Sequence, residues 1–486
     1  MAAIDLGASN GRLLVGTLRR GRLDLSVCAR FEHRARRRGG YWRWDWAAIR
    51  SAVRLGLRRA AVAAPGRLES VSCSAWAQDF GLLDARGRLL ADPVSYRDPR
   101  TEPYLAALQA RISPERLVRR VGSTAQGMVT LVQLLATAGR QPGLLGRART
   151  LLFVADLVHF DLCGVAATDP TLSSASQLAA LKSGTWDGPL LESLGVPARI
   201  LPPIRPAPAV LGAIGRGAPD RLLRDTPVCM TAGHDTAAAL SLAPPDEGAA
   251  FLSSGTWSMI GCRQAEPRIP AGLIRSRWAL LGLGGEWGLL KGLAGLWLIQ
   301  ECRRAWRRAG REWSYEDIAG LARAHGTAQS LIDPEWPGFR APPDMPAAVR
   351  RACRLTGQPV PDTPGGVAAV IFASLALDYR WALESLARAA RRSFASVWLI
   401  GGGSRNGLLN QLAADALGIP VVVGPSEATA LGNLVLQARA LGLIRTAEEG
   451  RRAALAPGAF RRHQPRRGWA DRLYPRFLEL KRTPLS

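Results

Sequence analysis

The chain of 486 residues is 47% hydrophobic, more apolar material than a single core uses, so we expect two domains. The formal net charge is +25, but lysine occurs only at positions 182, 291 and 481, and arginines are spread through the whole chain. Since no nucleic-acid-binding motif accompanies this charge, we expect no nucleic-acid partner. We interpret the dense basic runs Arg34–Arg38 and Arg461–Arg467 as solvated surface.

Seven cysteines are scattered along the chain without a paired or metal-binding spacing, which is typical of reduced thiols in a cytoplasmic protein. We find no signal-peptide pattern at the N-terminus. The longest apolar run, near Gly366–Leu377, is expected to be too short to span a bilayer. These features predict a cytoplasmic protein with no membrane partner.

The first half is expected to open with a buried strand at 2–5, a small-residue turn at 6–11 and a second strand at 12–18. Further strands are predicted at 22–31, 67–75, 150–154 and 226–232, a hairpin around Arg86-Gly87, and helices at 46–64, 103–110, 114–121 and 129–138. Strands that alternate with helices place the chain in the α/β class.

After Gly248 the opening pattern returns, with a strand at 249–252, a turn at 253–256 and a strand at 257–262. Further helices are predicted at 289–308, 366–390, 407–417 and 428–440, and further strands at 396–400 and 421–423. This repeat predicts two similar domains at 1–244 and 245–450, followed by a basic C-terminal extension at 451–486.

The first small-residue turn, Asp5-Leu6-Gly7-Ala8-Ser9-Asn10-Gly11-Arg12, has the composition of a phosphate-binding hairpin. Small residues let backbone N–H groups point at an anion, and Arg12 adds a fixed positive charge with paired donors. Asp5 could hold Mg2+ through water. A plain hairpin turn explains the same residues about as well, and the chain has no P-loop motif.

Asp235 is the candidate catalytic base. It lies in Gly233-His234-Asp235-Thr236, between a predicted strand and an alanine-rich helix. An aspartate here can merely cap the helix, or it can accept the proton of a hydroxyl group during phosphoryl transfer. Its position shortly before the second small-residue turn favours the catalytic role.

Two further small-residue motifs lie in the second half. Ser253-Ser254-Gly255-Thr256 is a candidate second phosphate contact, and paired with the first turn it is much more informative than alone. Gly401-Gly402-Gly403 joins a strand to a helix, where a flat ligand such as adenosine could approach the backbone, with Asn406 and Asn410 as nearby polar groups. Each motif could also be an ordinary tight turn.

Two segments of the first half, Ser74–Phe80 and Tyr96–Thr101, offer the mixture of apolar and polar groups that a polyol substrate needs. The candidate residues are Trp76, Gln78, Asp79, Arg97 and Asp98. A surface loop with ordinary ion pairs is the alternative for each residue taken singly.

Seven motifs resemble, in this order, those of the FGGY carbohydrate kinases, and most of all those of the rhamnulokinases: DLGASNGR, SYRDPRT, GHDT, SSGTWS, GLWLIQ, GGGSRN and EATALGN. The resemblance extends from Ala3 to about Leu443. It implies two actin-like (ribonuclease H-like) domains of the sugar kinase, hexokinase and actin superfamily, with ATP and Mg2+ in the cleft between them. It also implies phosphorylation of a ketose, with L-rhamnulose as the first candidate, by a monomer or homodimer.

The resemblance also implies roles for individual residues. The ATP-phosphate loop of the family falls on Ala8, Ser9, Asn10, Gly11 and Arg12, and further ATP contacts fall on Thr256, Gln300 and Gly402. The proton acceptor falls on Asp235, and sugar contacts fall on His234 and Thr236, with Ala77, Gln78 and Asp79 as further sugar-site candidates.

Two positions depart from the rhamnulokinase pattern. Ala77 replaces a glycine of the sugar site, and Gly292 replaces an asparagine. Both lie on the sugar side, so activity on L-fuculose or on another ketose or polyol stays open. A non-catalytic sugar-binding relative is the alternative from another class, although the candidate base and the phosphate turn are both present.

Overall fold

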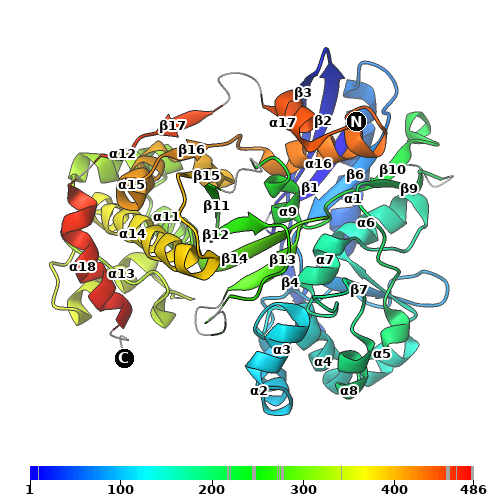
Figure 1. Cartoon of the computed structure of the whole chain (residues 1–486), viewed down its shortest axis with the longest axis horizontal. Helices are drawn as coiled ribbons and strands as arrows, with labels where there is room; N and C mark the ends of the chain where they lie inside the picture. Colours follow the sequence, from blue (N-terminus) through cyan, green and yellow to red (C-terminus); the bar gives the residue numbers. More distant parts are fainter. Residues whose placement is uncertain are drawn as a thin grey trace.

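The computed structural model describes residues 1–482, apart from residues 9, 216, 217, 219, 244–247, 271, 273, 275–277, 341, 456–459 and 467. Ser9 of the expected phosphate loop and the expected domain border at residue 244 therefore lie outside the described residues. Two mixed β-sheets lie side by side with helices packed on them (Figure 1). The predicted α/β class is confirmed.

In the part of the chain that the structure describes, the first sheet has six strands in the order β3-β2-β1-β6-β10-β9. β1 runs antiparallel to β2 and parallel to β6, and β10 continues the parallel part. The strand bounds are Ala2–Leu6 (β1), Asn10–Arg19 (β2), Arg22–Glu32 (β3), Val71–Ala75 (β6), Ala209–Ala213 (β9) and Pro227–Met230 (β10).

The second sheet has the order β13-β14-β12-β11-β15-β16-β17. Its strand bounds are Ala249–Ser254 (β11), Trp257–Gln264 (β12), Ala279–Gly282 (β13), Trp287–Ala294 (β14), Ser396–Ile400 (β15), Val421–Val423 (β16) and Arg461–His463 (β17). The antiparallel series β14-β12-β11, followed by the parallel strands β15 and β16, repeats the arrangement β3-β2-β1-β6-β10. The structure therefore contains the repeat that the sequence predicted.

One expected helix is partly a strand. We expected a single helix at 289–308, but β14 occupies the first part of this range and α11 begins only at Trp297. β14 pairs with β12 on one side and with β13 on the other, and most of its side chains are buried. An apolar run buried on both faces lacks the alternation that marks a strand, so its sequence resembles that of a buried helix.

Two small two-stranded sheets lie in the first half of the chain. The basic run at 34–38 lies largely in β4 (Ala35–Arg38), an exposed strand that pairs with β5 (Tyr41–Trp44). β7 (Phe80–Leu83) takes its ladder partner from β8 (Thr150–Phe153), far along the chain, whereas the residues beyond Arg86-Gly87 add one isolated bridge. The sequence between β7 and β8 gave no local sign of this pairing.

Helices complete both domains. In the first domain they are α1 (Trp46–Ala63), α2 (Glu102–Arg111), α3 (Pro114–Val121), α4 (Thr130–Arg140), α5 (Pro142–Arg147), α6 (Val154–Cys163), α7 (Pro170–Ala175), α8 (Gly188–Ser193) and α9 (Asp235–Leu240). After β11 come α11 (Trp297–Arg308), α12 (Tyr315–His325), α13 (Met345–Leu355), α14 (Pro364–Ala390), α15 (Gly407–Leu417), α16 (Ala428–Ala440), α17 (Ala447–Ala454) and α18 (Trp469–Arg482).

The chain crosses between the sheets more often than continuous domain ranges allow. α16 and α17 follow β16 of the second sheet, but they pack on the first sheet, on the face opposite α1 (Figure 1). The chain then returns, because β17 pairs with β16 and α18 packs into the second core. α16 and α17 thus pack on the first sheet although they lie almost wholly within the predicted range 245–450, since packing of a helix on a distant sheet leaves no local sequence pattern.

α9 and α16 cross in direct contact between the two sheets. α9 follows β10 of the first sheet, yet its Leu240 packs with Trp398 of the second sheet. A Cβ added to Gly432 of α16 would overlap the carbonyl oxygen of Ala238 in α9. Glycine at this position therefore lets the two backbones approach closely.

The 27-residue helix α14 is the long core helix of the second domain. By length and composition alone it could cross a membrane, so the expectation that this apolar run is too short is wrong. In the structure, 83% of its most apolar window is buried, and it packs against α12, α15 and β12. Burial in the domain core thus accounts for its hydrophobic length.

We expect Gly432→Ala to lower the free energy of unfolding by about 1–3 kcal/mol, because the new methyl group must push α9 away. Gly320→Ala is the matched control, since Gly320 also lies inside a helix and an added Cβ there meets nothing within 4 Å. That substitution should instead stabilise the protein by about 0.5–1 kcal/mol. Thermal unfolding measures both variants. A melting temperature for Gly432→Ala equal to that of the unmodified protein would contradict the close helix contact.

Candidate active site

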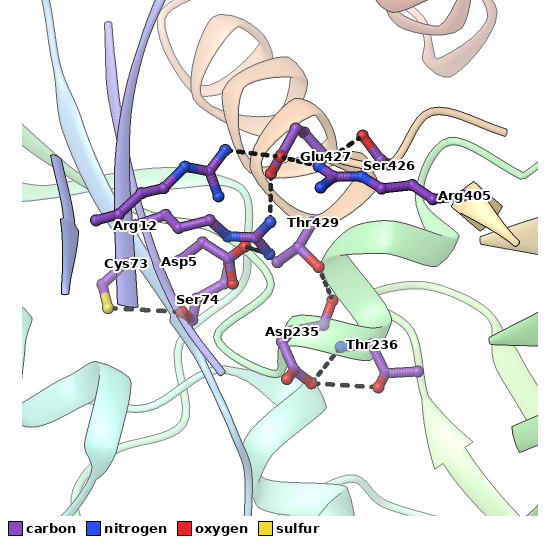
Figure 2. A network of polar contacts seen from close by, with 11 residues as sticks. Asp5, Arg12, Cys73, Ser74, Asp235, Thr236, Arg405, Ser426, Glu427 and Thr429 are labelled. Atoms are coloured by element: carbon purple, nitrogen blue, oxygen red, sulfur yellow. Dashed lines mark hydrogen bonds and ion pairs between the residues drawn. The ribbon is translucent and has the colours of Figure 1, made fainter. Parts of the chain in front are cut away.

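Three parallel strands of the first sheet lead into polar residues at one edge. Asp5 lies near the end of β1, Ser74 is its register partner near the end of β6, and Asp235 follows the loop after β10. The carboxyl ends of parallel strands meet at the same edge of a sheet, where α/β proteins commonly bind ligands. Figure 2 shows the three side chains in one view, with polar contacts that reach the start of α16.

Asp235 is held through one of its two carboxylate oxygens. Oδ1 accepts hydrogen bonds from the Thr236 amide at 2.6 Å and from the Thr236 hydroxyl at 3.2 Å (Figure 2). His234 Nδ1 lies 3.0 Å from Oδ1 and also accepts from the Thr236 amide, at 3.1 Å. These contacts with described residues all involve Oδ1, so Oδ2 is left to accept a proton from a ligand.

A buried aspartate fixes the loop that carries Asp235. Oδ2 of Asp169 accepts a hydrogen bond from the Gly233 amide at 3.1 Å, and Oδ1 accepts from the Thr171 amide at 2.7 Å. The Thr171 hydroxyl in turn accepts from the His234 amide at 3.1 Å. Burial raises the pKa of Asp169, and the hydrogen bonds that it accepts oppose this shift. Sequence reasoning missed Asp169, whose only local signal is its position before Pro170 and Thr171, typical of an N-cap.

Arg12 connects Asp5 with Glu427. Asp5 and Arg12 are direct partners across β1 and β2. Arg12 Nη2 lies 2.7 Å from Asp5 Oδ2, and Arg12 Nη1 lies 2.5 Å from Glu427 Oε2 (Figure 2). Burial raises the pKa of Asp5 to about 6; Arg12 opposes this shift, and the negative charges of Asp235 and Glu427 add to it. The predicted base, the predicted metal-site aspartate and Arg12 therefore form one electrostatic unit.

The rest of the first turn is a tight hairpin at the protein surface. The Gly7 amide donates to the carbonyl of Asn10 at 2.9 Å. Asn10 is exposed and Ala8 is half-buried, so both can be reached by a ligand beside Arg12. A Cβ on Gly11 would overlap the Phe31 ring, so close packing beneath the hairpin accounts for that glycine.

Thr256 and Gln300, which the resemblance links to ATP, lie together. The carbonyls of Gly255 and Thr256 accept hydrogen bonds from the amides of Leu296 and Trp297, at 2.8 and 3.1 Å, so α11 begins directly on the second turn. This placement brings the Gln300 side-chain amide to 3.2 Å from the Thr256 hydroxyl. The polar pair is therefore positioned by the junction between the turn and α11.

The three glycines after β15 have different surroundings. A Cβ on Gly401 would lie 2.7 Å from the Ser254 carbonyl oxygen, and a Cβ on Gly403 would overlap the Ser254 hydroxyl. A Cβ on Gly402 would meet nothing within 4 Å. Gly401 and Gly403 therefore let the second turn pack against this loop, whereas Gly402 leaves open space where a ligand could approach.

Two asparagines expected near an adenosine site have structural partners. The Asn406 side chain caps α15 by accepting from the Leu409 amide at 3.0 Å. The Asn410 side chain is buried and donates to the Ser404 carbonyl at 2.9 Å. Asn406 thus caps α15 and Asn410 holds the glycine loop, while the buried Oδ1 of Asn410 has no hydrogen-bond partner among the described residues.

Asp79 is fully buried, and three side chains surround its carboxylate. Oδ2 accepts from the indole N–H groups of Trp44 and Trp76, at 2.6 and 3.0 Å, and Oδ1 accepts from Gln133 at 3.1 Å. Burial raises the pKa of Asp79 to about 6. The structure thus has Asp79 orienting two indoles rather than facing a ligand, and a direct sugar contact by this residue stays a prediction.

Gln78 has a strained backbone, with a φ of 82° that non-glycine residues seldom adopt. Its Oε1 accepts from the Thr130 amide at 3.2 Å, and its amide donates to the Ala175 carbonyl at 3.1 Å. Ala77 beside it is buried. Gly292, the other departure from the family pattern, is exposed on β14, and an added Cβ there would meet nothing within 4 Å.

The acidic side chains suit a hydrated metal ion rather than a metal held by protein alone. Among the described residues, no group of three or more His, Cys, Asp or Glu side chains is placed to hold a metal ion. Mg2+ usually keeps several waters and binds through one or two carboxylates together with phosphate oxygens. Asp5 and Asp235, which interact electrostatically, fit that donor set.

Comparisons with known proteins agree along about nine-tenths of the chain. Residues 1–241 match the N-terminal domain of the FGGY family of carbohydrate kinases, and residues 250–441 match its C-terminal domain. The chain is 34% identical over 451 residues to the rhamnulokinase of Oceanobacillus iheyensis, covering 92% of this chain and 95% of that protein. It is 36% identical over 450 residues to the rhamnulokinase of Bacteroides thetaiotaomicron, covering 90% of each.

Solved structures of low sequence identity share the fold. A ligand-bound xylulose kinase from Lactobacillus acidophilus matches with a TM-score of 0.79 at 17% identity, covering 99% of this chain and 98% of the other. Plasmodium falciparum glycerol kinase with ADP matches with a TM-score of 0.79 at 12% identity, covering 99% and 96%. The repeated sheets and these likenesses define a two-domain α/β protein with an actin-like fold. The chain belongs to the FGGY family of carbohydrate kinases, and this membership implies ATP as a substrate.

We expect Asp79→Asn to flatten the dependence of stability on pH between about pH 4 and pH 6. The pKa of Asp79 is about 6 in the folded protein, above the value of about 3.9 for an unfolded aspartate. The folded state therefore binds more protons in this range, and the free energy of unfolding falls as the pH rises through it. Urea unfolding across this range measures the effect.

Asp84→Asn is the control for this prediction. Hydrogen bonds from Arg88 and Arg86 lower the pKa of Asp84, so its titration lies below the tested range. Burial raises the pKa of Asp5 and of Asp378 to about 6 as well, so only the difference between variant and unmodified protein is informative. Parallel stability profiles for Asp79→Asn and the unmodified protein would show that Asp79 does not titrate in this range.

Proposed function

We propose that the protein transfers the γ-phosphoryl group of ATP to a hydroxyl group of a ketose, with O1 of L-rhamnulose as the preferred acceptor. The observation that carries this proposal is Asp235, whose Oδ1 is fixed by Thr236 while Oδ2 is free for a ligand. The rhamnulokinases that are 34–36% identical over nine-tenths of the chain support the choice of sugar. A cytoplasmic location is proposed on the same basis.

Asp235 acts as the general base in this proposal. A carboxylate that accepts the proton of the attacking hydroxyl makes the oxygen more nucleophilic as it approaches the γ-phosphorus. The fixed Oδ1 prevents rotation of the carboxylate, so the remaining oxygen keeps one direction. His234 Nε2 and the Thr236 hydroxyl are the neighbouring groups that would orient the sugar.

The phosphate groups are assigned to the two turns. Ala8, Asn10, Gly11 and Arg12 would contact the phosphates from the first domain, and Ser9 is assigned with them from the sequence alone. Thr256, Gln300 and the open backbone at Gly402 would contact ATP from the second domain. Catalysis then consists mainly of positioning and of neutralising charge on the transferred group.

Mg2+ is the proposed metal cofactor. When bound, it would neutralise charge on the phosphate oxygens. Asp5 would hold it through water, since the Asp5 carboxylate is buried and already paired with Arg12. Asp5 would thus carry out two tasks, orienting Arg12 and fixing a metal-bound water.

Asp235→Asn should reduce kcat by several orders of magnitude while sugar binding stays within a few-fold, because the amide cannot accept the hydroxyl proton. Steady-state kinetics and direct titration with the sugar measure the two effects. Asp344→Asn is the matched control, since Asp344 caps α13 and asparagine caps equally well. Near-normal turnover by Asp235→Asn would remove this residue from the role of base.

The acceptor is tested with purified protein, ATP and Mg2+ against L-rhamnulose, L-fuculose, D-xylulose and glycerol, with ADP release as the signal. We expect the highest kcat/KM for L-rhamnulose. A higher value for another sugar would reassign the substrate and leave the kinase reaction intact. Activity on none of the four would speak against the proposed reaction and in favour of a non-catalytic sugar-binding protein.

A further inference from the structure

Three arginine side chains converge on Glu427, the residue that precedes α16. Arg12 Nη1 lies 2.5 Å from Oε2, and Nη2 groups of Arg30 and Arg405 both lie 3.3 Å from Oε1. Arg12 and Arg30 come from the first sheet, whereas Arg405 follows β15 of the second sheet. Figure 2 shows Arg12, Arg405 and Glu427 in this arrangement, next to Asp5 and Asp235.

The arrangement is costly without an anion between the arginines. Arg12 and Arg30 are direct partners across the antiparallel strands β2 and β3, where like charges repel. Glu427 supplies the missing negative charge and is only 14% exposed, whereas Arg30 and Arg405 are 53% and 65% exposed. Counting Asp5, three guanidinium groups face two carboxylates, and the charge of Asp235 acts on the same Asp5.

We propose that Glu427 is a positioning residue that occupies the place of a phosphate group and competes with the nucleotide for Arg12. This inference rests on the proposed function. In the structure Glu427 and Asp5 share the Arg12 guanidinium. When a nucleotide binds, a phosphate oxygen takes over Nη1 of Arg12, and Glu427 stays paired with Arg30 and Arg405.

The geometry gives Arg12 one hydrogen-bonding group that can change partner and one that cannot. Nη2 is held by Asp5, which is buried in the sheet and fixed by its strand. Nη1 is held by Glu427, whose negative charge is also paired with Arg30 and Arg405. If phosphate replaces Glu427 at Nη1, Glu427 keeps Arg30 and Arg405 as partners, and no buried charge is left unpaired. If phosphate replaced Asp5 at Nη2, the buried Asp5 carboxylate would lose its arginine.

The competition predicts that loss of the Glu427 charge tightens nucleotide binding. We expect Glu427→Gln to lower the Kd for ADP, measured calorimetrically with Mg2+ and without sugar, by about tenfold, the size of one charge-assisted interaction. Glu427→Asp, which keeps the charge but withdraws it by one methylene, should tighten binding by less. This second variant keeps the test open if Glu427→Gln folds poorly.

A double-mutant cycle shows whether the effect passes through Arg12. In an Arg12→Met background, Glu427→Gln should change the Kd for ADP by less than about twofold. Asp471→Asn is the matched control, since Asp471 also pairs with an arginine, at 2.7 Å, but lies on α18 at the far end of the second domain (Figure 1). It should leave the Kd unchanged.

The outcomes separate this inference from the proposed function. Unchanged or weaker ADP binding by Glu427→Gln would overturn the competition, and so would an equal gain in the Arg12→Met background. Failure of the unmodified protein to bind ADP would instead overturn the proposed function and this inference with it.

Discussion

The buried polar face of α16 is the contact on which the site depends. Asn433 Nδ2 donates to the Ser74 hydroxyl at 2.9 Å and to the Thr231 hydroxyl at 3.1 Å, and Gln437 Nε2 donates to the Ala2 carbonyl at 2.9 Å. All of these groups are buried, so loss of one partner would leave an unsatisfied polar atom in the core. The helix that enters from the second sheet thereby fixes β1, β6 and β10, whose ends lead to the candidate catalytic residues.

The reciprocal crossing of α9 and α16 joins the two halves of the site. α9 begins at Asp235 and packs toward the second sheet, whereas α16 begins after Glu427 and packs on the first sheet. The Thr429 hydroxyl donates to the Asp235 carbonyl at 3.4 Å, so the first turns of both helices touch (Figure 2). A shift of one sheet relative to the other would therefore move the proposed base, Asp235, together with Glu427, whose carboxylate pairs with Arg12.

Local sequence patterns predicted the features that neighbouring residues determine, such as the bounds of helices and the position of turns. The helices at 407–417 and 428–440 have the expected bounds, because an asparagine cap and a closing Gly418 mark the first and apolar spacing marks the second. The return of strand, small-residue turn and strand after Gly248 predicted the second sheet. The placement of Asp235 after a strand and at the start of a helix was also readable from its neighbours.

Non-local packing determined what the sequence did not show. The sequence near β14 does not indicate that strands flank it on both sides. The sequence of α16 does not indicate that this helix, which follows the second sheet, packs on the first sheet. Glu427 meets Arg12 and Arg30 only in the folded chain, because both arginines lie about 400 positions earlier in the sequence. Likewise Asp79 looked like a ligand contact, and only the fold reveals the two indoles that surround it.

The segment proposed for the sugar side, residues 77–79, is held by packing more than by exposed polar groups. The Gln78 carbonyl accepts from the Thr130 hydroxyl at 2.9 Å and from Gln133 at 3.1 Å, and Gln133 also donates to Asp79. α4 thus supports both the strained backbone at Gln78 and the buried carboxylate. The methyl group of Ala77 is buried and packs inside this segment. In the proposed function, sugar preference would depend on how α4 holds residues 77–79, as well as on the groups that touch the sugar.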